Sequence, residues 1–337
     1  MVGVSTAMPK TYKSWANGYK TVVDTMFKKG KDYTSGIFYK DTTESWEDRI
    51  VEVGGIDDFS VWEDGEGPAQ SNIVEGYSKN FTQVPFGLKV PFGRLFQKFV
   101  PKDVVSTKKA MIQLGKKAYR QMQKAPFSLL SYGFSDTNAY LTGITGTTVS
   151  ALGPDSKRLF STLHSCSPVN ATTWSNVLSD NAVVGVDALE SMIENLHNQL
   201  DDKSEKKHYG EEGYIWVVPI EKLADAKKAV LSDKDPDSAE NAINPFHGNF
   251  DGRPIEVRYV PWISDVSSTA HFLIAREVVE EEMPLVMLTS QEFYTDDYTD
   301  DDSKTAYARG QMIYVTGFVS GRGLVGSLGT GTGTYSD

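Results

Sequence analysis

Cysteine is almost absent from this chain of 337 residues: Cys166 is the only one, which excludes an internal disulfide framework. No apolar run reaches the roughly 18 residues that a membrane-spanning helix needs, so no membrane partner is expected. The first residues also lack the apolar core of a secretory signal. We therefore expect a protein that is made and kept in a reducing compartment.

The usual catalytic motifs are missing as well. The sequence contains no phosphate-binding G-x-x-x-x-G-K-[S/T] loop, no G-x-S-x-G elbow and no H-E-x-x-H pair. Gly321, Gly323 and Gly326 do spell G-x-G-x-x-G after a predicted strand, but a dinucleotide site needs this loop to open a helix. Only 11 residues follow Gly326, and they are rich in Gly, Ser and Thr. The motif is therefore not expected to bind a dinucleotide.

Two weaker candidates for chemistry remain. His164 and Cys166 stand two apart in a strand-like stretch and could share one face as a nucleophile and its base, although a small buried thiol beside an ordinary histidine explains them more simply. The acidic cluster at 296–302 lacks the spacing and the central glycine of a calcium-binding loop, and it is typical of a solvated loop. We predict no catalytic residue, no cofactor and no metal site, and hence no enzyme.

Charge is distributed unevenly along the chain. The formal net charge is −11, yet the segment from Lys102 to Lys124 carries seven basic residues against one acid, which is +6 and leaves −17 elsewhere. The segment from Glu277 to Asp302 has ten acids and no base. A basic helix and an acidic ribbon indicate two faces with different surroundings, and the alternative is that both are simply solvated.

The first third of the chain consists of parts that would not fold alone. Residues 1–44 show scattered aromatic residues without periodicity, which is typical of an arm that packs on a neighbour. Strand-like runs at Arg49–Val53 and Asn80–Val90 flank a segment rich in Gly and acids, which predicts a long two-stranded hairpin. Because an isolated hairpin is marginal in water, it needs a neighbour within or between chains.

The clearest helix is predicted over 103–124. Its apolar residues Val104, Met111, Leu114, Ala118 and Met122 share one stripe, Asp103 is the expected N-cap and Pro126 the expected stop. Helices are predicted at Asp187–Leu200 and Ile220–Leu231. Strands are predicted at Arg158–Leu163, Tyr214–Val218, Ile255–Val260, His271–Ala275 and Gln311–Val319. This order predicts an α+β fold.

A series of ordered phrases resembles the major capsid proteins of tailed phages, including the Mu-like prophage major head subunit group. The phrases are VVP at 217–219, NAINP at 241–245, YVPWISD at 259–265 and FLIA at 272–275, within a resemblance that covers roughly residues 155–330. The basic helix and the hairpin before it stand where this family has its spine helix and extended loop. The resemblance implies the Hong Kong 97-like capsid fold.

The resemblance also implies a division of the chain. The expected parts are an N-terminal arm at 1–44, an extended hairpin loop at 45–95, a first part of the peripheral domain at 96–150, a mainly axial domain at 151–302, a peripheral return strand at 303–329 and a tail at 330–337. Two departures from the type member stand out. About 45 residues precede the hairpin, so a scaffold is a separate protein, already removed, or absent. No asparagine follows Asn249, so the type member's Lys–Asn cross-link is not expected.

The function implied is structural: copies of the chain form hexamers and pentamers of an icosahedral head around double-stranded DNA, in the virion and, during assembly, in the host cytoplasm. The alternatives are a scaffold-linked or tail component and, last, a Cys/His enzyme. Expected partners are the chain itself, packaged DNA without sequence preference, a portal, a scaffold and a decoration protein. Candidate inter-subunit residues are Trp15, Tyr19, Trp62, Glu63, Asp64 and Glu66. Candidate residues facing DNA or a scaffold are Lys108, Lys109, Lys116 and Lys117.

Overall fold

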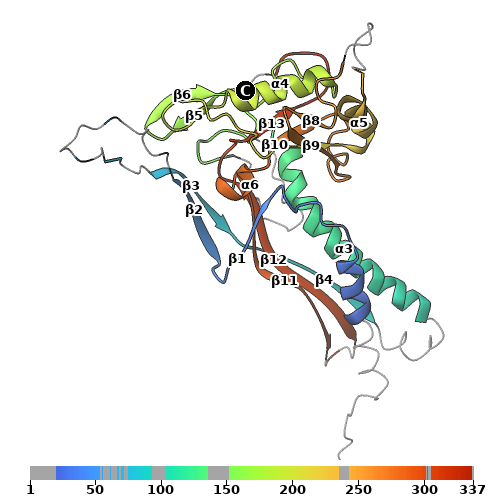
Figure 1. Ribbon diagram of the computed structural model, residues 1–337. Helices are drawn as coiled ribbons and strands as arrows, with labels where there is room; N and C mark the ends of the chain where they lie inside the picture. The colour runs from blue at the N-terminus through green and yellow to red at the C-terminus, as the bar shows by residue number, and fades with distance from the viewer. Residues whose placement is uncertain are drawn as a thin grey trace, which may run out of the picture.

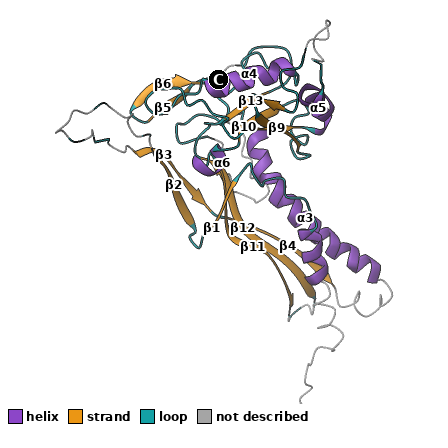
Figure 2. Cartoon of the chain, viewed as in Figure 1, coloured by secondary structure: helices purple, strands orange, loops and turns teal. Residues whose placement is uncertain are grey.

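The computed structural model describes residues 20–53, 75–92, 104–135, 152–234, 243–300 and 305–335, together with residues 55, 61, 67, 70, 71 and 302. Among them, helices and strands separate into two sheets with one long helix beside both (Figures 1 and 2). The predicted α+β class is confirmed. No helix in this part of the chain is long and apolar enough to cross a membrane.

A four-stranded sheet with the order β1-β11-β12-β4 forms the elongated half of the molecule. Its strands are β1 (Tyr39–Thr42), β11 (Leu285–Thr299), β12 (Ala306–Phe318) and β4 (Val84–Phe92). The strand β1 runs parallel to β11, whereas the other pairs are antiparallel. Two irregularities in the β11 register lie between Thr289 and Tyr294, while β12 alternates without interruption.

The long helix α3 spans Val104–Ser131 and lies along one face of this sheet. Met111 and Leu114, both on the predicted stripe, are fully buried. The prediction that the helix ends before Pro126 was wrong, because Pro126 lies inside it. A proline in a helix costs about 3 kcal/mol. The turn that follows buries Phe127 and Leu130 completely, and each such side chain contributes roughly 2 kcal/mol, which offsets that cost.

A five-stranded sheet with the order β13-β10-β7-β9-β8 forms the compact half. Its strands are β7 (Tyr214–Val218), β8 (Asn249–Phe250), β9 (Arg253–Tyr259), β10 (His271–Ala275) and β13 (Leu324–Ser327). All five residues of β7 and of β10 are buried, so neither face of these strands meets water. The predicted strands 214–218 and 271–275 are confirmed to the residue.

Both faces of the five-stranded sheet are covered. Trp216 and Leu273 pack with α4 (Val186–His197) and α5 (Leu223–Leu231), which the short helix η1 (Ile220–Lys222) precedes. Ile215 and Phe272 point the other way, into a cluster that contains Phe127 and Leu130 from the end of α3. The short helix α6 (Val278–Glu281) links β10 to β11. The end of α3 therefore joins the two sheets into one core.

Two small hairpins and a short helix at residues 20–28, which packs on α3 through Val23, complete the described part. The strands β2 (Glu47–Val53) and β3 (Glu75–Thr82) pair antiparallel and confirm the predicted hairpin. The prediction that residues 84–90 belong to it was wrong, since the chain leaves the hairpin at Gln83 and β4 pairs with β12. The strands β5 (His164–Ser167) and β6 (Asn170–Trp174) pair with each other. The predicted strand at 158–163 was also wrong, because regular pairing begins only at His164.

The predicted division of the chain into an arm, a hairpin loop, and peripheral and axial parts stays a prediction. The segment 303–329, the predicted peripheral return, contributes β12 to the elongated sheet and β13 to the compact sheet. The segment 151–302 likewise contributes strands to both sheets.

Candidate assembly surfaces

The β2–β3 hairpin projects away from both sheets (Figure 1). Its connecting residues include Val61, whose side chain is 100% exposed. Trp62, Glu63, Asp64 and Glu66 lie outside the described residues, as do Trp15 and Tyr19. Their role in subunit contacts stays a prediction.

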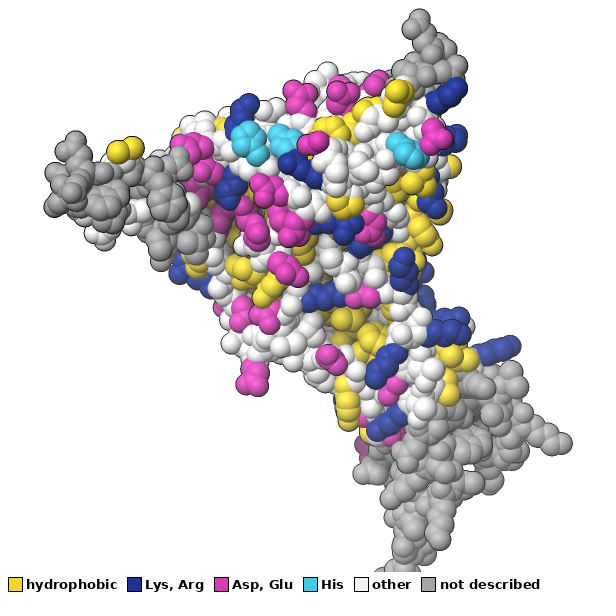
Figure 3. All heavy atoms as spheres, viewed as in Figure 1, with side chains coloured by type: hydrophobic (Ala, Val, Ile, Leu, Met, Phe, Trp, Pro, Cys, Tyr) yellow, Lys and Arg dark blue, Asp and Glu magenta, His cyan; other side chains and the backbone are white. Residues whose placement is uncertain are grey.

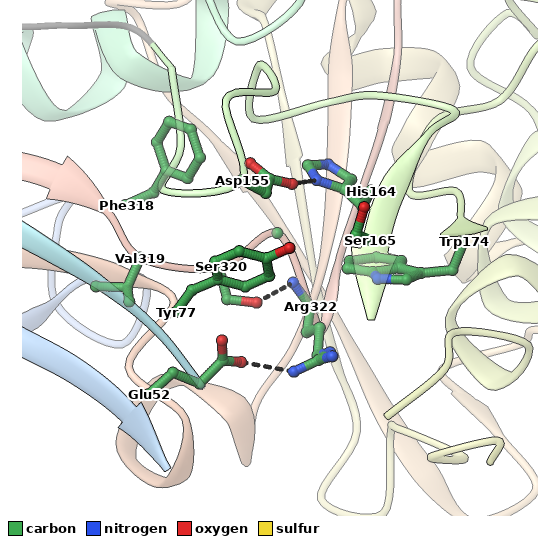
Figure 4. A pocket seen from close by; sticks show the side chains of 11 residues that line it. Glu52, Tyr77, Asp155, His164, Ser165, Trp174, Phe318, Val319, Ser320 and Arg322 are labelled. Atoms are coloured by element: carbon green, nitrogen blue, oxygen red, sulfur yellow. Dashed lines mark hydrogen bonds and ion pairs between the residues drawn. The ribbon is translucent and has the colours of Figure 1, made fainter. Parts of the chain in front are cut away.

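A buried arginine holds the base of this hairpin to the compact half (Figure 4). The side chain of Arg322 is only 5% exposed, and its guanidinium pairs with Glu52 on β2 at 2.6 Å and with Asp202 at 2.8 Å. It also donates to the carbonyl oxygens of Leu200, at 3.1 Å, and Cys166. Arg322 lies in the turn between β12 and β13. It thus connects this turn to three other parts of the chain: the hairpin, the strand β5, and the loop that follows α4.

Electrostatics at this junction favour the ion pairs. Burial disfavours the charged form of Arg322, but the Glu52 and Asp202 carboxylates outweigh it and raise the pKa of Arg322. Burial likewise raises the pKa of Glu52, and Arg322 opposes that effect without cancelling it. The cavity here holds only about 10 Å³, room for about one water molecule. The junction is therefore closed packing and offers no space for a ligand.

Arg322 was not predicted from the sequence, because the glycines around it were interpreted only as a nucleotide-binding motif that lacks its helix. Their real role is close packing: a Cβ on Gly321 would stand 2.5 Å from Asn176 Nδ2, and one on Gly326 would stand 2.8 Å from the Phe160 ring. A single charged residue among small and apolar ones was the signal that could have identified it.

Apolar contacts and a second buried cation also fix the hairpin base. Phe81 of β3 is 2% exposed and packs with Val286, Leu288 and Val315 on the elongated sheet. Lys79, the only lysine between residues 47 and 82, donates to the Leu152 carbonyl at 2.8 Å and lies 4.5 Å from the centre of the Phe318 ring. Burial lowers the pKa of Lys79 to about 8.

The basic surface of α3 is visible as Lys and Arg side chains along one side of the molecule (Figure 3). Lys109, Lys116 and Lys117 are exposed, whereas the side chain of Lys108 lies outside the described residues. Arg120 and Lys124 instead pair with Asp265, at 3.3 Å and 3.1 Å. No ion pair to Lys109, Lys116 or Lys117 occurs among the described residues, so these three are available to a partner.

The acidic ribbon at 277–302 does not form one surface. Glu277 accepts hydrogen bonds from backbone amides of the loop before β7, including that of Glu211 at 3.2 Å. Glu282 accepts from Tyr209 at 2.8 Å and pairs with Lys207. Asp296, much further along, pairs with Arg309. Several of these acids therefore neutralise groups of their own chain. In the described part, no three His, Cys, Asp or Glu side chains gather as metal ligands would.

The geometry does not bring His164 and Cys166 together as a nucleophile and its base. The imidazole of His164 contacts Asp155 at 2.6 Å through Nδ1 and the Leu159 carbonyl at 3.2 Å through Nε2. The Cys166 sulfur faces the Ser204 hydroxyl at 3.9 Å, and burial raises the pKa of the thiol. Both histidine nitrogens have other partners, so the arrangement is structural.

Comparison with known proteins places this geometry in context. No protein-family model matches the chain, and no curated protein matches it either. Solved structures do: the capsid of Ralstonia phage GP4 matches with a TM-score of 0.55 and 14% identity, over 97% of this chain and 98% of that one. The capsid of Cyanophage P-SCSP1u matches with a TM-score of 0.52 and 10% identity, over 86% and 85%. A structure from Mycobacterium phage Patience matches with a TM-score of 0.50 and 10% identity, over 99% and 92%.

These likenesses cover 85% or more of each chain, at sequence identities of 10–14%. The expected architecture is therefore confirmed: this chain has the Hong Kong 97-like fold of phage capsid proteins.

Proposed function

We propose that the chain is the major capsid protein of a tailed double-stranded DNA phage or prophage, and that copies of it assemble into hexamers and pentamers of an icosahedral head. The observation that carries this proposal is the fold likeness to the GP4 capsid over 97% of this chain and 98% of the other. A hairpin that projects from the body, with its base locked by Arg322, supports it. Such a subunit acts by burying surface at contacts with neighbouring subunits that close into rings. Its role is therefore structural and not enzymatic.

The test is assembly of the full-length chain. Negative-stain microscopy and sedimentation of the expressed protein should reveal shells or capsomer-sized rings. Deletion of Gly65–Ser71 should leave a soluble subunit but abolish stable heads, because the tip is proposed to lie over a neighbouring subunit. A chain that stays monomeric under all assembly conditions contradicts the proposal, and normal heads from the deletion variant contradict the role of the tip.

The basic surface of α3 has a role of its own in the proposal. Lys109, Lys116 and Lys117 are proposed to face the interior, where they contact phosphates of packaged DNA or the acidic surface of a scaffold without sequence preference. The alternative is that they pair with acids of an adjacent subunit. Charge reversal at Lys116 and Lys117 separates the two: normal shells with altered DNA retention favour DNA contact. Loss of assembly, restored by an acid-to-base change in the partner surface, favours pairing.

The remaining partners follow from the same role. A portal, a scaffold and a decoration protein are proposed as further partners, with the virion as the final location and the host cytoplasm as the site of assembly. The enzyme alternative is tested by Cys166→Ala, which should leave assembly and infectivity unchanged. The thiol of Cys166 accepts a hydrogen bond from the Ser204 hydroxyl, and burial raises its pKa. A loss of biological activity with intact particles would reopen that alternative.

A further inference from the structure

A groove opens between α3 and the elongated sheet, beside the strand β4, and its volume is about 240 Å³. We name it the α3 groove. One wall is a face of α3, and the other wall and the floor come from β4, β11 and β12. The lining residues that matter most are Leu114, Lys117 and Ala118 of α3, Phe86 and Leu88 of β4, and Phe293 of β11.

The α3 groove leaves apolar surface open to solvent. Leu88 is 52% exposed although it lies on the same side of β4 as Phe86. Gly310 is opposite Leu88 in the strand register, so β12 adds no side chain at this point of the floor. A Cβ on Gly310 would stand 2.9 Å from the Phe293 ring. A partner that covers Leu88 therefore removes apolar surface from water, which is favourable.

The aromatic walls of the groove are fixed before any partner arrives. The Phe86 ring stacks on Tyr314 with centroids 4.8 Å apart, and the Phe293 ring stacks on Phe27 at 4.6 Å. A preformed site loses little side-chain entropy on binding. Pockets for whole small molecules measure about 300–1,000 Å³, so the smaller α3 groove fits one large side chain of a peptide better.

The charge at the groove favours an acidic partner. Lys117 lines it and is exposed, as is the adjacent Lys116, and neither forms an ion pair within the described part of the chain. The sequence before α3 does not supply acids: residues 1–19 contain two lysines and no acid, and residues 93–103 contain three basic residues and one acid. Charge complementarity therefore favours an acidic segment of another molecule.

The combination of lysines and an apolar groove favours a protein over DNA. Duplex DNA meets such lysines through its phosphates, and these contacts need no apolar groove. An amphipathic peptide uses both features, because its apolar side chains enter a groove while its charged side chains pair at the rim. Phe86, Leu88 and Phe293 have no role in a phosphate contact, whereas they match a buried side chain.

We infer that the α3 groove receives a large apolar side chain from an acidic segment of a separate partner protein, with carboxylates of that segment meeting Lys117 and Lys116. The inference rests on the proposed function, in which this surface faces the interior of the shell. It selects a protein segment rather than DNA as the partner at this part of α3, and it makes Leu88 and Ala118 determinants of that contact.

Calorimetric titration of the full-length, unassembled subunit with two synthetic peptides tests the groove. The probe is Glu-Glu-Glu-Phe-Glu-Glu-Glu, and its control has alanine in place of phenylalanine. The phenylalanine peptide should bind about tenfold more tightly, because only it buries a large apolar side chain. Ala118→Leu, which fills the groove from α3, should abolish this preference without lowering the thermal midpoint.

Leu88→Ser is a second variant at an exposed position, and it should reduce the preference for phenylalanine. Lys227→Glu, on the exposed surface of α5, is the matched control and should preserve it. No binding, equal affinity for the two peptides, or a preference that survives both groove variants overturns the inference.

The other occupants give different results. Binding of a DNA duplex should be unchanged by Ala118→Leu, and a loss as large as that of the phenylalanine peptide assigns the groove to DNA. Tighter binding of a peptide of residues 54–76 than of the probe assigns it to a second copy of the chain. Either result overturns the inference. The titration needs no shell, so a subunit that binds the probe as expected but never assembles contradicts the proposed function alone.

Discussion

Replacement of Arg322 by methionine should destabilise the subunit and loosen the hairpin at its base. Methionine keeps much of the length of the side chain but removes every donor of the guanidinium. The variant loses the pairs with Glu52 and Asp202 and the hydrogen bonds to the Leu200 and Cys166 carbonyls. Since Glu52 and Asp202 are each only 14% exposed, the two carboxylates remain buried without a counter-charge.

Removing one partner of a buried ion pair costs about 3–5 kcal/mol in free energy of unfolding. That range applies at neutral pH, where both carboxylates are ionised in the unfolded chain. Burial already raises the pKa of Glu52, and loss of Arg322 raises it further. A carboxyl whose pKa is raised by folding destabilises the protein as pH rises above its unfolded value of about 4.3. The difference between the variant and the unaltered chain should therefore shrink as pH falls from 7 towards 5.

Urea unfolding of soluble subunits, followed by tryptophan fluorescence at pH 7 and pH 5, measures both effects. Hydrogen exchange of the β2 amides reports the local loosening. The matched control is Arg276→Met, because Arg276 is 33% exposed and pairs with Glu256 at 2.8 Å near the surface. Such a pair contributes at most about 1 kcal/mol. Equal destabilisation by the two variants, or faster exchange confined to segments other than the hairpin, would refute the reasoning.

Three further predictions test the packing around this junction. In the unaltered chain, stability should rise by roughly 2 kcal/mol between pH 8 and pH 10, because burial lowers the pKa of Lys79 to about 8 and the unfolded chain binds more protons in this range. Lys79→Met should remove this rise, and an equal change of the urea midpoint with pH in both proteins would contradict the prediction. Gly321→Ala should lower stability by about 1–3 kcal/mol, since its Cβ would stand 2.5 Å from Asn176 Nδ2, whereas Gly67→Ala, with nothing within 4 Å, should not shift the thermal midpoint. Cys166 should react with a thiol reagent only as fast as the protein unfolds, because the side chain is fully buried and burial raises its pKa; rapid reaction in the folded subunit would be inconsistent with the structure.

The junction explains how a hairpin that cannot fold alone acquires a fixed direction. Phe81 supplies apolar burial on the elongated sheet, and Arg322 supplies a directional link to the compact half. Both anchors lie at the base of the hairpin. The strands β2 and β3 therefore project in a direction that the body sets.

Local patterns in the sequence were enough to determine several elements. The stripe of α3 follows from helical periodicity, and Met111 and Leu114 are buried as it predicts. The strands Tyr214–Val218 and His271–Ala275 follow from short apolar runs and are buried on both faces. Ordered phrases in the second half indicated the fold class. These features depend on neighbours in sequence, so the sequence by itself determined them.

Tertiary structure alone decided the rest, because the deciding partners are far apart along the chain. Pro126 stays inside α3 because the turn after it is buried against the compact sheet. Residues 84–92 leave the hairpin because β12, more than 200 positions later, pairs with them. Arg322 gains its role only when Glu52 and Asp202 are folded around it. The pairing of Tyr298 with Tyr307 and of Asp296 with Arg309 depends on the β11 register, which shifts twice between Thr289 and Tyr294.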